Sequence, residues 1–481
     1  MTAILAVSTL LAAFSGVTAT ADETSSSVDA AASKAGYSFV GTLGARHARD
    51  IEGSVWSIGA ETMDRDFTVY ENWRGYLGPL GAKKARIQSG WAKTETKRGE
   101  YQWGWMDRIV RDMVDQGVEP WACLCYGNPI YPGGGGIGLG EGFLTSEEAL
   151  DAWLRYVAAF VDRYGDVIDG WELWNEPRED RGAPPHAYAE FVRRTALVIR
   201  KEQPGAQVYF AAGGSFDERY ARAVLDYLKQ RRALHLVDRV IYHPYAYNPD
   251  SKDGEVASLR QLVKSYASHL GVMQGENGAP SKRGGFGAIN RDHPWSEENQ
   301  TKWALRRLLG DFGSGIPSSY FTICDIAYPS RVNYKGLLSI TPDKRVSGVK
   351  QAYGTLQRLF SLFDNRLQPT DSAVKIRNYA NRFRAFSSLS GGTYPVVAMW
   401  RSDEAPGINS DFESIDLSVP KHRFGEPVWI DLLTGKVFAV DGDSWKRKGR
   451  ETVFQKVPVY DSPILVAELA GIGHAMTADD E

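Results

Sequence analysis

Between about Ser54 and Asp364, short apolar runs alternate with longer segments whose apolar residues recur every three or four positions. The short runs predict buried strands, and the three-to-four-residue spacing predicts amphipathic helices. The predicted strands are Val55–Ile58, Ala85–Gln88, Pro120–Cys125, Gly170–Trp174, Val208–Ala211, Val240–Tyr242, Val272–Gln274 and Tyr320–Cys324. Eight such units indicate an α/β fold, a closed (β/α)₈ TIM barrel, and match it better than a doubly wound open sheet.

The helix predicted after the third strand has the clearest pattern. Its apolar positions share one face: Leu150, Trp153, Leu154, Val157, Phe160 and Val161. Thr145 and Glu148 predict a capping box at its start. The other predicted helices are Trp105–Asp115, Tyr188–Lys201, Glu218–Arg231, Val256–Leu270, Asn299–Leu309 and Lys350–Phe363.

After Asp364 the pattern changes to β-favouring runs between Gly, Asp and Pro turns. These runs include Val396–Trp400, Val428–Ile430 and Ile464–Ala467, and Leu433–Lys436 is expected to connect a hairpin. We therefore expect the barrel over 51–365, an antiparallel β-sandwich domain over 366–470 and a tail over 471–481.

The N-terminal segment is predicted to be a signal peptide over 1–21. Residues 3–17 are apolar but too few to span a bilayer, and small residues follow up to Ala21. This pattern predicts a secreted or periplasmic protein, although no Lys or Arg precedes the apolar run, so a disordered apolar tail is the alternative. The Ser- and Ala-rich stretch up to Lys34 predicts a flexible leader within 22–50. No other run is long and apolar enough to be a membrane span.

The composition narrows the classes of ligand. The 481 residues include 56 Lys and Arg against 59 Asp and Glu, a net charge of −3. This balance argues against nucleic acid or an anionic membrane as partner, because both require a basic face. Aromatic residues make up 12% of the chain and favour ligands with flat faces, such as sugars. Cys123, Cys125 and Cys324 are too few for a disulfide framework and are expected to be buried thiols.

Two glutamates follow predicted strands at the end where TIM barrels carry their active sites. Glu176 lies in Trp-Glu-Leu-Trp-Asn-Glu-Pro after the fourth strand, and Glu276 lies in Gln-Gly-Glu-Asn-Gly after the seventh. Glycoside hydrolysis requires one carboxylic acid that protonates the leaving oxygen and one carboxylate that attacks the sugar. We expect Glu176 to be the acid and then the base, and Glu276 to be the nucleophile. The alternative is that Glu172 and Glu176 form ordinary buried ion pairs.

These motifs resemble clan A of the glycoside hydrolases, and most closely family 39 and its relatives. The resemblance covers about residues 50–365 and the C-terminal sandwich. It implies a retaining enzyme whose catalytic glutamates end strands four and seven, the first preceded by Asn.

The resemblance also implies roles for four further residues. Arg86 is expected beneath the nucleophile, where a cation keeps Glu276 ionised, and Asn175 is expected to bind the sugar 2-hydroxyl. His243 and Tyr245 are expected to hold the nucleophile. The alternatives are an ion pair at the barrel floor for Arg86 and a satisfied core position for His243.

Strand eight departs from the clan, because many members carry a tryptophan there and this chain reads Cys-Asp-Ile-Ala-Tyr over 324–328. Asp325 is expected either to bind a sugar hydroxyl, with Tyr328 as an apolar wall, or to pair with a barrel arginine. By position alone, three further residues are predicted sugar contacts: Trp91, Asn128 and Tyr131.

Gly133–Gly138 match the G-x-G-x-x-G pattern, but no helix opens there and no Lys-Ser/Thr follows. We expect a mobile loop over the barrel mouth rather than a dinucleotide site. The eight histidines lack the spacing of metal ligands. Neither a cofactor nor a metal is predicted.

Together these features predict a secreted retaining glycoside hydrolase that cleaves a β-linked oligo- or polysaccharide by double displacement, with exo action. The alternative is a non-catalytic glycan-binding relative, which is disfavoured because both glutamates are present. A barrel lyase or aldolase would need a Schiff-base lysine at a strand end, and none is found there. The sequence does not indicate an oligomeric state.

Overall fold

The computed structural model describes residues 23–290, 293–377 and 382–477, and the predicted signal peptide lies outside them. The chain forms two compact units. One is the continuous segment Ala45–Asn365, and the other combines the N-terminal segment up to Gly44 with the chain from Arg366 onward.

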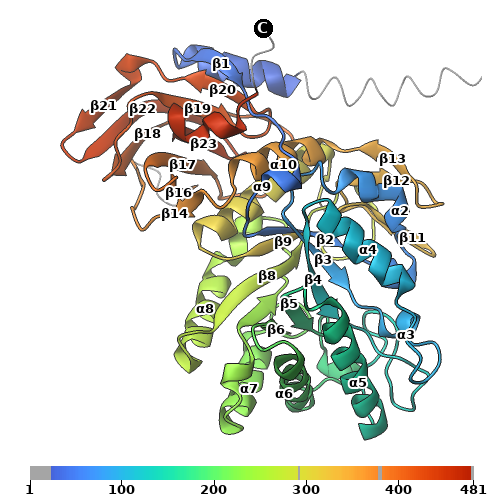
Figure 1. Cartoon of the computed structure of the whole chain (residues 1–481). Helices are drawn as coiled ribbons and strands as arrows, with labels where there is room; N and C mark the ends of the chain where they lie inside the picture. The colour runs from blue at the N-terminus through green and yellow to red at the C-terminus, as the bar shows by residue number, and fades with distance from the viewer. Residues whose placement is uncertain (1–22, 291–292, 378–381, 478–481) are drawn as a thin grey trace, which may run out of the picture. The chain divides into compact units, whose positions relative to one another are not determined.

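The segment Ala45–Asn365 contains a closed barrel of eight parallel strands (Figure 1). The strands are β2 (Trp56–Ala60), β3 (Lys84–Gln88), β4 (Glu119–Leu124), β5 (Gly170–Leu173), β6 (Gln207–Ala211), β7 (Arg239–Tyr242), β8 (Gly271–Asn277) and β9 (Ser318–Tyr320). Each strand pairs with the next, and β9 returns to β2 to close the barrel. The predicted fold is confirmed, with one strand displaced.

The displaced strand is the last one, predicted over Tyr320–Cys324. Regular pairing ends at Tyr320 because the chain turns away from the ladder and continues through single hydrogen bonds. Phe321 N–H donates to the carbonyl of Asn277, and Ile323 N–H donates to that of Gly59.

Helices connect the strands and cover the barrel (Figure 1). They are α2 (Tyr70–Trp73), α3 (Trp91–Thr94), α4 (Gly104–Asp115), α5 (Glu147–Tyr164), α6 (Pro185–Glu202), α7 (Glu218–Gln230), α8 (Asp253–Tyr266), α9 (Glu297–Gly313) and α10 (Gln351–Leu362). The predicted capping box of α5 is wrong by one residue. Ser146 is the N-cap and accepts from Ala149 N–H, so Thr145 lies outside the helix. Two hairpins lie between β9 and α10: β10 (Ile326–Tyr328) with β11 (Arg331–Asn333), and β12 (Leu338–Ile340) with β13 (Val346–Val349).

The other unit is a β-sandwich of two antiparallel sheets. A seven-stranded sheet has the order β1-β20-β19-β23-β17-β16-β14, and a four-stranded sheet has the order β15-β18-β22-β21. The strands are β1 (Ser38–Thr42), β14 (Leu367–Pro369), β15 (Lys375–Ile376), β16 (Phe383–Ser390), β17 (Tyr394–Arg401), β18 (Glu413–Pro420), β19 (Pro427–Asp431), β20 (Lys436–Ala439), β21 (Trp445–Lys448), β22 (Glu451–Val459) and β23 (Ile464–Glu468), and the short helix α11 (Leu469–Ile472) follows. The predicted hairpin connection joins β19 to β20, as expected.

The predicted flexible leader is wrong. Residues 23–34 form a helix, and Val28 and Ala32, four positions apart, are fully buried in the sandwich core with Trp429. Alanine has the highest helix propensity. Packing of Val28 and Ala32 in the sandwich core stabilises the helix further. The Ser- and Ala-rich composition that suggested flexibility therefore encodes a helix, and β1 follows it and pairs with β20.

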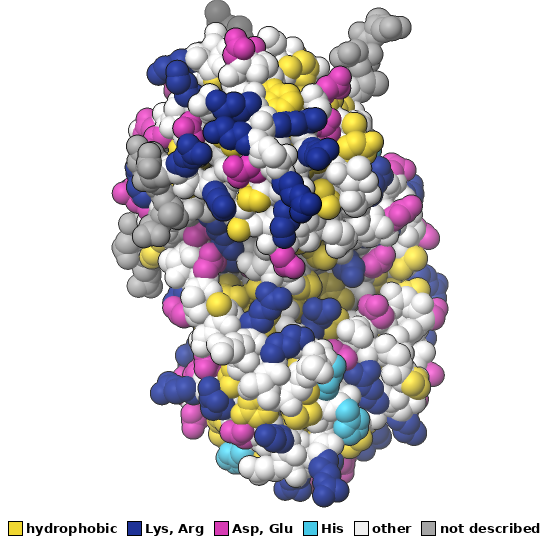
Figure 2. All heavy atoms as spheres, turned by 90° about the vertical axis from the view of Figure 1, so that its left-hand side faces the viewer, with side chains coloured by type: hydrophobic (Ala, Val, Ile, Leu, Met, Phe, Trp, Pro, Cys, Tyr) yellow, Lys and Arg dark blue, Asp and Glu magenta, His cyan; other side chains and the backbone are white. Residues whose placement is uncertain are grey.

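The surface is mixed in charge. On the face shown in Figure 2, Lys and Arg side chains are interspersed with Asp and Glu and with hydrophobic side chains. Across the described residues, every helix is too short or too polar to cross a lipid bilayer. The three cysteines are free and buried, as predicted.

Candidate active site

The segment after β5 places Asn175 and Glu176 at the barrel mouth. Trp174 anchors it, because its N–H donates to the carbonyl of Leu124 and its ring packs edge-on against Phe143, with centroids 4.7 Å apart. Trp174 and Glu176 have left-handed backbone conformations, with φ of 69° and 47°. Such conformations cost a non-glycine residue roughly 1 kcal/mol or more and cluster at functional sites.

The end of β8 presents Glu276. The pairing of β8 with β9 shifts register between Gln274 and Asn277, so the strand bulges at the glutamate. Gly275 precedes it, and a Cβ there would lie 2.4 Å from Cγ2 of Ile241. The glycine lets the strand pack against its neighbour while Glu276 faces the mouth.

Arg86, fully buried on β3, connects the carboxylates. Its Nε donates to Oε2 of Glu172 at 2.7 Å, and its Nη1 donates to Oε1 of Glu61 at 2.8 Å and to Oε2 of Glu276 at 3.2 Å. Its Nη2 donates to Oδ1 of Asn175 at 2.9 Å. Arg86 thus lies beside Glu276 at the barrel mouth, and the alternative of an ion pair at the barrel floor does not hold.

Glu276 is held in its charged form. Burial raises the pKa of this carboxyl, but the nearby charges of His243 and Arg86, the hydrogen bond from Tyr245 and the charge of Lys335 together bring it below its usual value. The Tyr245 hydroxyl donates to Oε1 at 2.8 Å. Tyr245 therefore has the contact expected of it.

The pKa of Glu176 is shifted in the opposite direction, so its protonated form is favoured. Burial raises its pKa, the contact with His243 lowers it, and the charge of Glu276 raises it, with a net result above the usual value. His243 was expected to hold the nucleophile, but its Nδ1 lies 2.8 Å from Oε1 of Glu176. Burial lowers the pKa of His243, and the two glutamates outweigh that effect and raise it.

Three residues of the site escaped the sequence analysis. Glu61 directly follows β2, so the strand-end rule had offered a signal for it, and burial raises its pKa to about 7. Tyr126 accepts from Nδ2 of Asn175 at 2.6 Å. Lys335 is 1% exposed, its ammonium lies 5.3 Å from the ring centre of Tyr245, and burial lowers its pKa to about 7. No local pattern marks Lys335, since it follows the β10–β11 hairpin.

The predicted sugar contacts Trp91, Asn128 and Tyr131 form a buried cluster around Glu95, and Trp91 also lines a cleft with Tyr126 and Tyr328. The Tyr131 hydroxyl and the Trp91 indole donate to the Glu95 carboxylate, and the Asn128 amide donates to its backbone carbonyl. Trp91 and Tyr131 stack with centroids 5.6 Å apart. Glu95 thus engages one donor of each of these three residues.

Asp325 is also engaged within the protein. Its carboxylate lies 2.6 Å from the ammonium of Lys350 and accepts from Gly336 N–H at 3.0 Å. The alternative of an ion pair therefore holds, although the cation is a lysine from the residue before α10 rather than an arginine. Tyr328 lines a cleft, as expected of an apolar wall.

This cleft, of about 830 Å³, is lined by Tyr126, whose hydroxyl accepts from Asn175, the residue before Glu176. The loop over 127–142 forms one side and is closely packed, because a Cβ at Gly134 would lie 2.0 Å from the carbonyl oxygen of Asn128. Backbone bonds from Gly127 to Gly136 and from Asn128 to Gly134 close it. Gly127 and Gly134 therefore permit close backbone approach in this loop.

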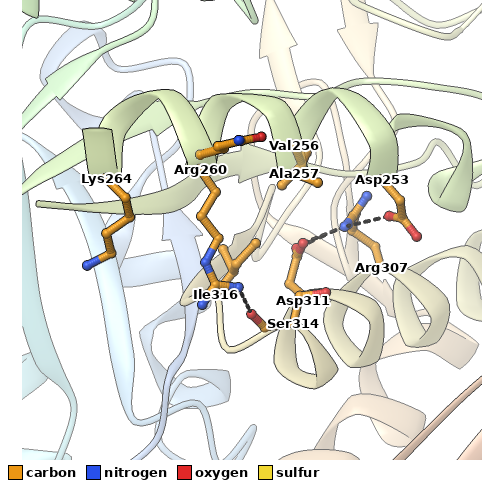
Figure 3. A pocket seen from close by; sticks show the side chains of 10 residues that line it. Asp253, Val256, Ala257, Arg260, Lys264, Arg307, Asp311, Ser314 and Ile316 are labelled. Atoms are coloured by element: carbon orange, nitrogen blue, oxygen red, sulfur yellow. Dashed lines mark hydrogen bonds and ion pairs between the residues drawn. The ribbon is translucent and has the colours of Figure 1, made fainter. Parts of the chain in front are cut away.

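A second pocket, of about 300 Å³, lies between α8 and α9 (Figure 3). Its charged groups are engaged with one another: Arg307 pairs with Asp311 and Asp253, and Arg260 donates to the carbonyl of Ser314. Its two carboxylates, Asp253 and Asp311, both pair with the guanidinium of Arg307, so both are engaged in ion pairs.

Among the described residues, Glu176, His243 and Glu276 bring metal-type ligand atoms together, all within 4.8 Å of one another. The cations of Arg86 and Lys335 beside Glu276 oppose a metal ion there. At this distance, both carboxylates can contact the same small chemical group of a ligand.

Comparison with protein-family models and with curated proteins finds no match. Solved structures do match. A family 39 glycoside hydrolase from the gut symbiont Bacteroides cellulosilyticus WH2 aligns with a TM-score of 0.63 at 17% identity, over 87% of this chain and 81% of its own. A monomeric β-xylosidase from Caulobacter crescentus CB15 aligns with a TM-score of 0.55 at 15% identity, over 89% and 97%. A family 30 subfamily 8 xylanase from Clostridium acetobutylicum aligns with a TM-score of 0.55 at 11% identity, over 88% and 97%. These likenesses show that the chain shares the fold of clan A glycoside hydrolases.

Proposed function

We propose that this protein is a retaining glycoside hydrolase that removes a β-linked sugar by double displacement. The observation that carries the proposal is the pair of neighbouring carboxylates with opposite pKa shifts. Glu276, lowered, is suited to attack as a carboxylate, and Glu176, raised, is suited to donate a proton. One carboxylate oxygen of each glutamate lies within 4.8 Å of the other. This proximity supports the retaining mechanism, in which the carboxyl groups are about 5 to 5.5 Å apart, over the inverting one, in which they are about 6.5 to 9.5 Å apart.

In the first step Glu276 attacks the anomeric carbon while Glu176 protonates the departing oxygen. The Glu276–sugar bond forms as the glycosidic bond breaks. Arg86 and Tyr245 each hold one oxygen of Glu276, which fixes the orientation of the carboxylate for attack. Asn175 has a second amide N–H beside the one donated to Tyr126, and we assign it to the sugar 2-hydroxyl.

In the second step water attacks the ester, and Glu176 takes its proton. Burial is the largest cause of the raised pKa of Glu176, and repulsion from the Glu276 carboxylate adds to it. Because the ester carries no charge, this repulsion is lost and the pKa of Glu176 falls, so its carboxylate is available as the base. The proton then resides on Glu176, and the free enzyme is restored.

The test is to trap the ester. A 2-fluoro glycoside with a good leaving group, chosen from a panel of aryl glycosides, inactivates the enzyme, and peptide mass spectrometry is expected to find one label on Glu276. Glu276→Gln is expected to take no label, whereas Glu255→Gln, at an exposed helix position, takes it normally. A label on another residue would contradict the assignment.

We extend the proposal to exo action and export. The loop over 127–142 forms a wall at the barrel mouth, which favours removal of one terminal sugar. A single monosaccharide released first from a reduced oligosaccharide supports exo action, and mixed fragments contradict it. N-terminal sequencing of protein recovered outside the cell tests cleavage after Ala21.

A further inference from the structure

The cleft lined by Tyr126 has a wall of aromatic rings. Tyr328 lies between two phenylalanines, with centroids 4.9 Å from Phe67 and 5.2 Å from Phe286. Phe286 is 36% exposed, and the guanidinium of Arg331 lies 4.0 Å from its ring centre. The three rings come from different loops of the barrel and line the same cleft.

The facing wall is the tip of the glycine-rich loop. Ile137 and Leu139 line the cleft and are 45% and 50% exposed, which is high for large aliphatic side chains. Glu141 fixes this tip, because its carboxylate accepts from the N–H groups of Ile137 and Gly138 at 3.1 Å. The aliphatic side chains are therefore presented by an ordered turn.

The polar side chains around the cleft are largely engaged with the protein. Arg65 donates to Asp64 and to Gln88, and Lys93 pairs with Asp66. A sugar bound in a cleft needs directed hydrogen bonds for its hydroxyls, whereas an apolar group needs area. The aromatic rings and the aliphatic side chains of Ile137 and Leu139 provide apolar contact area in this cleft.

We propose that this cleft binds an apolar leaving group, so that the substrate is a glycoside of an alkyl or aryl alcohol rather than the interior of a polysaccharide. This inference rests on the proposed function and narrows its substrate class. Cleavage breaks the bond between the anomeric carbon and the aglycone oxygen. The aglycone leaves as the free alcohol or phenol with the proton of Glu176, and water supplies the hydroxyl of the released sugar.

Kinetics with methyl, butyl and octyl β-glycosides of the accepted sugar test the inference. These alcohols have similar acidity, so chain length changes binding rather than chemistry. We expect kcat/KM for the octyl glycoside to exceed that for the methyl glycoside by at least about tenfold. In Leu139→Gln this ratio falls severalfold, whereas Leu197→Gln, an exposed leucine on α6, keeps it. A ratio near one, or a trisaccharide preferred over the octyl glycoside, would overturn the inference.

Binding of 2-naphthol, measured by calorimetry, tests the cleft without catalysis. We expect wild-type protein to bind it, Leu139→Gln to bind it about threefold to tenfold more weakly, and Leu197→Gln to bind it normally. Absent or variant-independent binding contradicts the inference. If 2-naphthol binds as expected but no glycoside is cleaved, the proposed reaction fails and the apolar site stands. If glycosides are cleaved without dependence on chain length, the reverse holds.

Discussion

His243 lies against Glu176, with its Nδ1 2.8 Å from Oε1 of that glutamate, rather than in hydrogen-bond contact with Glu276. The histidine is buried, and the charges of both glutamates raise its pKa. It therefore influences the proton donor by a hydrogen bond and the nucleophile by its charge, and this dual position makes pH dependence an informative probe of the site.

Turnover of the wild-type enzyme is expected to show a bell-shaped dependence on pH. The acidic limb reports loss of the Glu276 carboxylate, whose pKa lies below the ordinary 4.5, and the basic limb reports loss of the Glu176 proton, whose pKa lies above 4.5. The profile of kcat/KM from pH 3 to 9 on one aryl glycoside measures the midpoints of both the acidic and the basic limb. A single limb would contradict the division of roles.

His243→Phe is expected to move the whole bell to higher pH. His243 lowers the pKa of both glutamates, so its removal raises both, and the two midpoints shift in the same direction. The measurement is the same pH profile, with His269→Phe, at an exposed histidine, as the control. A shift of one limb alone would show that His243 acts on one glutamate.

Lys335→Met is expected to shift the acidic limb alone to higher pH. Lys335 lowers the pKa of Glu276 through its charge, and its own pKa of about 7 means that this help fades as pH rises. The contrast with His243→Phe separates the two residues. Lys264→Met, at an exposed lysine on α8, serves as the control, and an unchanged acidic midpoint in Lys335→Met would remove Lys335 from the site.

Glu176→Ala is expected to lose about 10²- to 10⁴-fold in turnover of glycosides with poor leaving groups, the usual contribution of a general acid. Substrates with activated phenols lose less in the first step, because their oxygen needs no proton. Azide, which needs no base, is expected to restore turnover and give a glycosyl azide detectable by NMR. If azide fails to rescue a folded variant, Glu176 is not the acid and base.

The Asp325–Lys350 pair is expected to matter for stability. Lys350→Met leaves a buried carboxylate without its cation and is expected to lower the free energy of unfolding by about 3 to 5 kcal/mol. Asp325→Asn combined with Lys350→Met is expected to recover most of this loss in urea denaturation. A rise in KM in the double variant, with stability restored, would return Asp325 to a role in binding.

The strand-end rule explains what the sequence made predictable. Eight apolar runs indicate where the barrel strands lie, and polar residues that follow such runs reach the mouth, as Glu176 and Glu276 do. Arg86 lies within β3, and its place beside Glu276 was expected from the family resemblance. Residues on connecting segments were less predictable. The Tyr131 hydroxyl donates to the buried carboxylate of Glu95. This contact depends on how the loops pack, which the positions of the strands do not determine. Lys335 follows the β10–β11 hairpin, far along the chain from Tyr245, whose ring its ammonium contacts.

The N-terminal helix and β1 belong to the same unit as the last strands, so the barrel is inserted into the chain of the sandwich. Ser38 pairs with Ala439, about 400 residues later. At roughly 5 to 20 residues per second, ribosomal synthesis separates the two by about 20 to 80 s. The barrel, a continuous segment, is complete well before that time. The strand β1 must therefore wait unpaired while the barrel folds, and the sandwich closes last, once the final strands have emerged.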